Sequence, residues 1–260
     1  METNILTLEQ KRKWKKNGYL ILRNVLSQQE IKNLTMVVDQ MYQEHLQQPE
    51  VKPNAEFDRR NVMDENDIFL PLMDHQVTFP IVLELMDPYI LLGMSEVIVR
   101  PPNPESNGIL HTDGGQAMRQ IRVSQSSLPL QIKIGYWLTD ISHQKMGNMV
   151  VMPGSHRQQY LDAYDTHESV SGERILCQPK GTMTIMNSSI WHRVEPNESE
   201  VTRKNIFVAY CPSWITPADH LQSSPEWMSI LNREQRIIMR SYKWAYHNAK
   251  PPAEDFPLFL

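Results

Sequence analysis

The chain has 260 residues, of which 40% are hydrophobic and 22% are charged, as is typical of a globular protein. Its net charge of −4 argues against nucleic-acid binding, which calls for a strongly basic surface. Cys177 and Cys211 form neither a disulfide framework nor a zinc-binding spacing. No stretch has the length and hydrophobicity of a membrane span or a signal peptide, so we expect a cytoplasmic protein that binds no membrane.

The N-terminal region predicts two helices with a short strand between them. Thr7 and Gln10 have capping-box spacing, as do Ser27 and Glu30, so a helix should begin after each first residue. Gly18 lies where a helix C-cap glycine belongs, and residues 19–23 are expected to form a strand. The second helix should pack on a sheet through an apolar stripe made of Ile31, Leu34, Val38, Met41 and His45.

Residues 50–67 are polar and aperiodic. We interpret this segment as a surface loop, with a lid over a substrate pocket as the alternative. Its acidic residues, among them Asp64, are candidates to meet a cationic group of a substrate.

Short strands separated by Pro and Gly turns make up most of the remaining chain. After a helix at 78–86, strands are predicted at residues 95–100, 130–138, 149–152, 174–178, 182–186 and 204–210. In the clearest one, Gln131, Lys133 and Trp137 face away from the apolar even-numbered residues. The pattern predicts a mainly β sandwich or barrel with flanking helices, in one domain over residues 1–260, with a helical tail at 213–260.

The segment Ile109-Leu-His-Thr-Asp-Gly-Gly115 sets His111 and Asp113 two residues apart, hence on one face if the chain is extended. His192 follows a strand and a turn, and Arg203 opens the next strand. Two imidazoles and one carboxylate leave three metal positions open, which is the arrangement of non-haem Fe(II) oxygenases. The planar guanidinium of Arg203 can pair with the distal carboxylate of 2-oxoglutarate. We therefore predict His111, Asp113 and His192 as the catalytic metal ligands, Fe(II) and 2-oxoglutarate as cofactors, and O2 as co-substrate.

These residues belong to a series of motifs that resembles the phytanoyl-CoA dioxygenase (PhyH) family of Fe(II)/2-oxoglutarate oxygenases. The resemblance covers about residues 7–212, through Asn17-Gly-Tyr-Leu-Ile-Leu-Arg23, His111-Thr-Asp113, Gly147-Asn-Met-Val-Val-Met-Pro-Gly-Ser-His156 and His192 to Arg203. It implies a double-stranded β-helix of the jelly-roll or cupin type. It also implies hydroxylation of a substrate C–H bond with release of succinate and CO2, and the carboxylate of Asp113 disfavours the related halogenase chemistry.

The chain departs from the family at Val194, where relatives often have a serine that assists the co-substrate arginine. Gln131 or Lys133 is our expected substitute, and Thr112 and Trp137 are further candidates for co-substrate binding. Contacts with the substrate are expected from the polar residues after the motif and from the acidic segment before it, namely Gln116, Arg119, Arg122 and Asp64.

The resulting hypothesis is a hydroxylase of a small polar metabolite in natural-product biosynthesis, for example of an alkaloid or polyketide of the cylindrospermopsin type. One alternative is an acyl-CoA hydroxylase, although the chain offers no clear basic patch for the phosphates of coenzyme A. The other is a non-catalytic metal-binding barrel, which would give Arg203 no role. The sequence does not determine the oligomeric state, and a monomer is our expectation.

Overall fold

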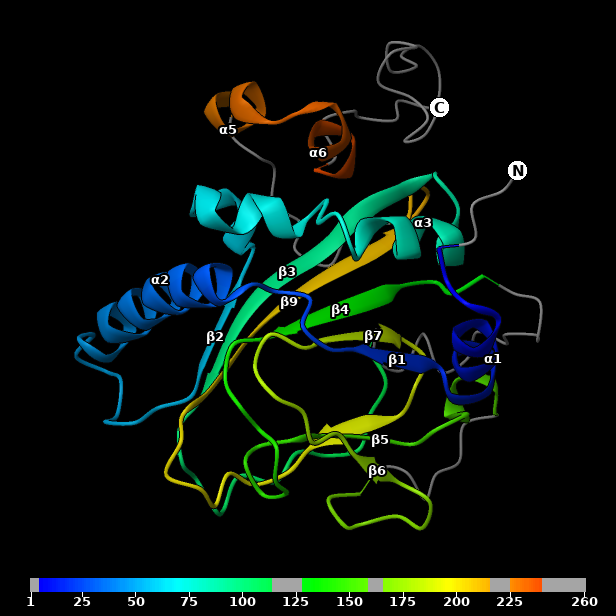
Figure 1. Ribbon diagram of the computed structural model, residues 1–260. Helices are drawn as coiled ribbons and strands as arrows, with labels where there is room; N and C mark the ends of the chain where they lie inside the picture. The colour runs from blue at the N-terminus through cyan, green and yellow to red at the C-terminus, as the bar shows by residue number, and fades with distance from the viewer. Residues whose placement is uncertain (1–4, 114–127, 159–165, 216–224, 240–260) are drawn as a thin grey trace.

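The computed structural model describes residues 5–113, 128–158, 166–215 and 225–239. Two antiparallel sheets face each other, and helices cover the outer face of the larger sheet (Figure 1). The larger sheet has the order β1-β7-β4-β9-β3-β2 and the smaller one β6-β5-β8. The strands are β1 Tyr19–Leu22, β2 Phe57–Arg60, β3 Ile90–Arg100, β4 Ile132–Trp137, β5 Met149–Val151, β6 Arg174–Ile175, β7 Met183–Asn187, β8 His192–Val194 and β9 Arg203–Pro212. This architecture confirms the prediction of a mainly β fold with flanking helices.

The helical segments are short apart from α2. They are α1 Leu8–Asn17, α2 Gln28–Leu46, η1 Val62–Asp64, η2 Asp67–Leu72, α3 Phe79–Met86, η3 Ser155–Arg157, α5 Pro225–Ile230 and α6 Arg233–Ile238. Both predicted capping boxes are present, at Thr7 and at Ser27. None of the described helices is long and apolar enough to cross a lipid bilayer. The last two helices lie within the predicted helical tail, of which residues 216–224 and 240–260 are outside the described part.

The two faces of the larger sheet have different partners. Ile132, Ile134 and Tyr136 of β4 point outward into the main core, together with the buried residues of α2. Trp137 points the other way, into a second cluster that contains Met149 and Val151 of the smaller sheet. We call the side that faces the smaller sheet the inner face. The alternation predicted for residues 130–138 is therefore confirmed, and both faces are buried.

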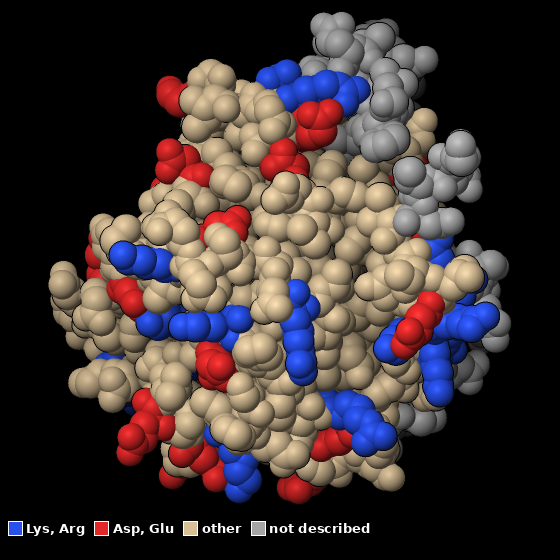
Figure 2. All heavy atoms as spheres, viewed as in Figure 1, with Lys and Arg blue, Asp and Glu red and all other residues tan. Residues whose placement is uncertain are grey.

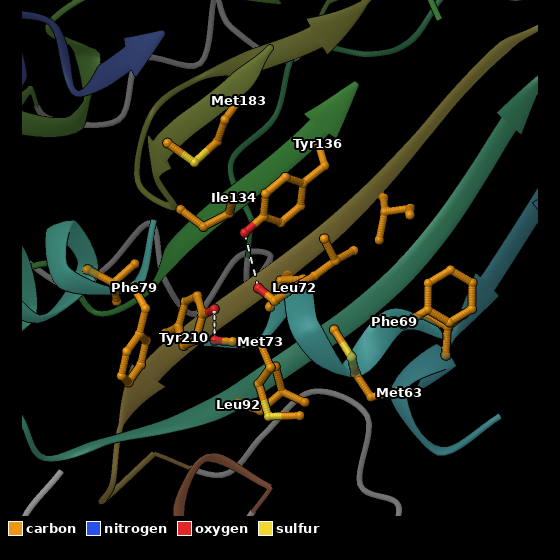
Figure 3. Packing of buried hydrophobic residues seen from close by; sticks show 14 of the residues in the cluster. Met63, Phe69, Leu72, Met73, Phe79, Leu92, Ile134, Tyr136, Met183 and Tyr210 are labelled. Atoms are coloured by element: carbon orange, nitrogen blue, oxygen red, sulfur yellow. Dashed lines mark hydrogen bonds between the residues drawn. The ribbon is translucent and has the colours of Figure 1, made fainter. Parts of the chain in front are cut away.

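Two tyrosines anchor the segment η2 to the outer face of the larger sheet. Tyr136 donates a hydrogen bond to the carbonyl of Leu72 at 3.0 Å, and Tyr210 donates one to the carbonyl of Met73 at 2.5 Å (Figure 3). Both phenols are fully buried. Their hydroxyl groups therefore satisfy carbonyls at the end of η2 that would otherwise lack partners in an apolar core.

The prediction that residues 50–67 form a surface loop is wrong for much of this segment. β2 pairs with β3 at the sheet edge, and η1 buries Val62 and Met63 completely. The strand Phe57–Arg60 has a single apolar residue, so hydrophobic alternation cannot reveal it. Phe57 holds it in place by packing against Tyr42 and His45 of α2, with ring centroids 6.2 and 4.9 Å away.

Charged side chains of both signs are interspersed on the face of the molecule shown in Figure 2. On this face, the positive groups do not merge into one continuous basic area. The view agrees with the low net charge of the chain.

Gly18 ends α1 with a φ of +82° and lies directly against the buried ring of His156. A Cβ at this position would stand 2.5 Å from Nδ1 of that ring, so both backbone strain and a clash oppose any side chain. Burial lowers the pKa of His156 to about 4, so the neutral ring acts as a packing element.

Gly18→Ala is therefore expected to lower the free energy of unfolding by about 2–6 kcal/mol, the sum of left-handed strain and overpacking. Urea denaturation measures this change. Gly172→Ala is the matched control, because Gly172 has a φ of +92° but its nearest non-neighbouring atom would be 3.7 Å away. An equal loss in the two variants would show that contact with His156 contributes nothing.

Candidate metal centre

The chain brings two of the predicted ligands together by pairing the segment around His111 with the start of β8 in the smaller sheet. After β3 the chain crosses over and runs antiparallel to β8, where His111 forms a bridge with His192. The amide of His111 donates to the carbonyl of His192 at 2.9 Å, and the reverse bond measures 2.8 Å. Directly opposed residues have neighbouring side chains. His192 is thus the first residue of β8, and it follows β7 and a short turn as the sequence predicts.

The three predicted ligands form a compact group. Each of His111, Asp113 and His192 offers one ligand atom, and these atoms lie within 4.8 Å of one another. Nδ1 of His111 lies 2.8 Å from the carbonyl of Ile109, and Nδ1 of His192 lies 3.0 Å from that of Ile190. Because a carbonyl only accepts, both Nδ1 atoms must donate, and each Nε2 keeps its lone pair for a metal.

Electrostatics keeps these groups in the protonation states that a metal needs. Burial lowers the pKa of His192 to about 4, so its ring is neutral at physiological pH. Burial opposes ionisation of Asp113, but the ammonium of Lys133, with smaller contributions from the protonated forms of the two imidazoles at acidic pH, outweighs it and lowers the pKa of that carboxyl. Metal ligands must be neutral imidazoles and ionised carboxylates, so the group is ready to bind.

Arg203 lies on the inner face at the start of β9 and is only 2% exposed. Its Nη1 donates to the carbonyl of Gly147 at 2.5 Å, and its guanidinium carbon lies 5.5 Å from the centroid of the Trp137 ring. Among the described residues, Nε has no hydrogen-bond partner and no carboxylate forms an ion pair with this guanidinium. Burial, with a smaller contribution from Arg100, lowers the pKa of Arg203 to about 9. A buried cation in this state favours the binding of an anion.

Asn205 is a residue of this site that the sequence analysis missed. It lies two residues after Arg203 on the same face of β9, is fully buried, and leaves both Oδ1 and Nδ2 without a partner among the described residues. The two-residue period of the strand from Arg203 could have identified it. Further buried side-chain atoms without partners occur on Thr112, Asp113, Thr182 and Ser188.

Lys133 lies at the metal end of the inner face. Its Nζ is 3.5 Å from Oδ1 of Asp113 and 4.5 Å from the centroid of the Phe207 ring. In the register of β4 and β9, Lys133 opposes Ala209, six residues along the strand from Arg203. Lys133 is therefore positioned beside the ligands rather than beside Arg203, where the serine of relatives would act.

The other predicted contacts are distributed more widely. Gln131 is half-buried on the inner face, where a Cβ built on Gly93 would lie 3.1 Å from its Nε2. Thr112 is buried between the two ligands of its own segment. Asp64 accepts a hydrogen bond from Asn61 at 2.8 Å, a local contact within its turn. Gln116, Arg119 and Arg122 lie outside the described residues.

The fold and the site together define a jelly-roll barrel with a metal centre of two histidines and one carboxylate. A family profile described as phytanoyl-CoA dioxygenase (PhyH) matches residues 14–205. The chain belongs to this family, which confirms the resemblance inferred from its motifs. No match to the sequence is found among curated proteins.

Solved structures share the fold at low sequence identity. HygX from Streptomyces hygroscopicus, with nickel and 2-oxoglutarate bound, has a TM-score of 0.68 and 16% identity over 81% of this chain and 89% of its own. The carbocyclase SnoK from nogalamycin biosynthesis has a TM-score of 0.62 and 17% identity over 80% and 84%. EctD from S. alaskensis, with 2-oxoglutarate and 5-hydroxyectoine, has a TM-score of 0.66 and 15% identity over 82% and 78%. These similarities confirm the predicted jelly-roll fold.

Proposed function

We propose that the protein is an Fe(II)- and 2-oxoglutarate-dependent oxygenase that hydroxylates a small polar metabolite. The observation that carries this proposal is the pairing of a His/Asp/His group with the buried guanidinium of Arg203, which has no carboxylate partner among the described residues. In a barrel that only binds a metal, the buried guanidinium of Arg203 would have no function. Membership of the family, and the metal and 2-oxoglutarate bound by HygX, support the same assignment.

The residues present fit both groups. His111, Asp113 and His192 would hold the metal through two neutral nitrogens and one carboxylate oxygen, the donor set that suits Fe(II). The buried atoms without partners, Nε of Arg203 and the amide of Asn205, would receive the distal carboxylate of 2-oxoglutarate. The amide of Asn205 then supplies the second contact that Val194 cannot.

The remaining inner-face residues orient the site and exclude water. Trp137 is fully buried, donates to the hydroxyl of Thr184 at 2.8 Å, and supports the guanidinium of Arg203 with its ring. Lys133 balances the charge of Asp113. Fe(II) with 2-oxoglutarate supplies O2 activation, and the balanced reaction converts substrate C–H, O2 and 2-oxoglutarate into C–OH, succinate and CO2.

The substrate is proposed to be a small polar metabolite of natural-product biosynthesis. This proposal is supported by the structural similarity to SnoK, an enzyme from nogalamycin biosynthesis. An alkaloid or polyketide of the cylindrospermopsin type fits this class. Acyl-CoA hydroxylation is the second candidate, because the family is named for a phytanoyl-CoA dioxygenase.

Anaerobic addition of Fe(II) followed by 2-oxoglutarate tests the proposal. We expect a weak visible charge-transfer band that needs both additions, and succinate release when O2 is admitted. A panel of polar metabolites and acyl-CoA thioesters, scored by stimulated succinate release, then separates the two substrate classes. Metal binding without a 2-oxoglutarate-dependent band would instead support the non-catalytic barrel.

A further inference from the structure

The inner face of the larger sheet carries a buried carboxylate that the metal centre does not use. Glu96 lies in the middle of β3 and is only 6% exposed. Along this strand Met94 and Ile98 pack into the cluster between the sheets, whereas Val97 and Val99 pack into the outer core. By this alternation the side chain of Glu96 points inward.

Glu96 interacts with three cationic residues among the described ones, namely Arg60, Lys133 and Arg100, and none of them neutralises it fully. Nε of Arg60 lies 3.4 Å from Oε1, at the long end of the hydrogen-bond range, and the Arg60 side chain is 63% exposed. Lys133 acts on Glu96 only electrostatically and has its ion pair with Asp113. Burial, with a smaller contribution from Asp58, raises the pKa of Glu96 despite these cations. A further positive charge would therefore stabilise the ionised form.

Unlike Glu96, the neighbouring acidic residues have close arginine partners. Arg100 holds Asp58 through two hydrogen bonds of 2.7 and 2.9 Å and lies 3.2 Å from Glu56. Arg59 pairs with Glu65 at 2.6 Å. The acidic residues that the sequence analysis offered for a cationic group are thus already paired, apart from the locally bonded Asp64, and the buried Glu96 is the stronger candidate.

The position of Glu96 suits recognition of a substrate held at the metal. Glu96 opposes Phe207 on β9, and the ring of Phe207 contacts Lys133, which contacts Asp113. β3 is two strands from β4, a separation of roughly 10 Å. A small molecule can span this distance, and the Phe207 ring beside the carboxylate adds a surface that favours cations.

We propose that Glu96 is the specificity-determining carboxylate of this barrel and that it binds an ammonium or guanidinium group of the substrate in place of Arg60. This inference rests on the proposed function and narrows its substrate class to cationic or zwitterionic molecules. Arg60, at the exposed edge strand β2, covers the carboxylate until the substrate cation displaces it.

The test uses the full chain loaded with Mn(II) and 2-oxoglutarate, with agmatine as the cationic probe and 1,5-pentanediol as a neutral probe of similar length. Paramagnetic broadening of the probe resonances in NMR reports binding near the metal. We expect agmatine to broaden and the diol not to. Glu96→Gln should weaken agmatine binding by at least about tenfold, the value of one lost charge contact near 1.4 kcal/mol. Arg60→Met should strengthen it severalfold, because the competing guanidinium is gone.

Glu44→Gln makes the same substitution at an exposed position on α2 and should leave agmatine binding unchanged. Loading is checked in every variant by the Fe(II)/2-oxoglutarate charge-transfer band. If that band forms normally while agmatine fails to bind the wild type, or binds Glu96→Gln equally well, the cation inference is overturned and the oxygenase proposal stands. If the band itself is absent from the wild type, the proposed function fails first.

Discussion

Arg203→Met is expected to weaken 2-oxoglutarate binding by at least roughly thirtyfold, since losing one partner of a buried charge pair costs about 2–5 kcal/mol. The guanidinium is buried, lies 5.5 Å from the centroid of the Trp137 ring, and has no carboxylate partner among the described residues. Metal binding should be unaffected, because Arg203 makes none of the contacts of the metal ligands. Titration of 2-oxoglutarate against the Fe(II)-loaded protein, followed by the charge-transfer band, measures the affinity.

The same substitution should stabilise the ligand-free protein. A buried cation without an anion is destabilising because it has lost its hydration. An apolar side chain of similar length has no such desolvation penalty, so we expect a gain of about 1–4 kcal/mol in unfolding free energy. Arg203→Lys is the control: it keeps the charge but loses the bidentate geometry, so its affinity should fall between those of the other two proteins. If Arg203→Met bound 2-oxoglutarate with normal affinity, Arg203 would not be a residue of the 2-oxoglutarate site.

Local sequence signals predicted the N-terminal helices and placed the candidate ligands His111 and Asp113 in one motif. The capping boxes at Thr7 and Ser27 depend on contacts three residues apart, so the sequence contains all the information that they need. The spacing of His111 and Asp113 is equally local. The meeting of that pair with His192 depends on a crossover between sheets, which no local spacing encodes.

The features that the sequence did not predict depend on contacts between strands and helices far apart in the chain. β2 is held in place because Phe57 packs on α2. The segment Phe57–Arg60 shows no alternation of hydrophobic and polar residues that would predict a strand. Asn205 and Glu96 are polar residues within strands, and their burial is apparent only once both sheets are in place. Sequence reasoning favoured polar residues in loops as substrate contacts. The structure draws attention instead to polar residues that strands hold inside the barrel, where removal from water makes each charge more consequential.

Asp113→Asn is expected to weaken metal binding by more than about 100-fold, because changes in residues that merely support ligands already cost 10- to 100-fold. The amide keeps the shape of the side chain but loses the charge and one strong oxygen donor. Thermal unfolding with and without Mn(II) measures the effect: the metal should raise the Tm of the wild type and leave that of the variant almost unchanged.

The metal-free variant should also be less stable than the wild type at neutral pH. The pKa of Asp113 is lowered from its ordinary value of 3.8 in the folded protein, so its ionised form stabilises the fold above that pH, and the contribution is lost as the pH falls further. Without the carboxylate, the buried Lys133 loses its ion-pair partner, at a cost of about 1–3 kcal/mol. Adding Lys133→Met to Asp113→Asn should restore the metal-free stability but not the metal binding. If the double variant regained the Mn(II)-induced shift in Tm, Asp113 would be a charge partner of Lys133 and not a metal ligand.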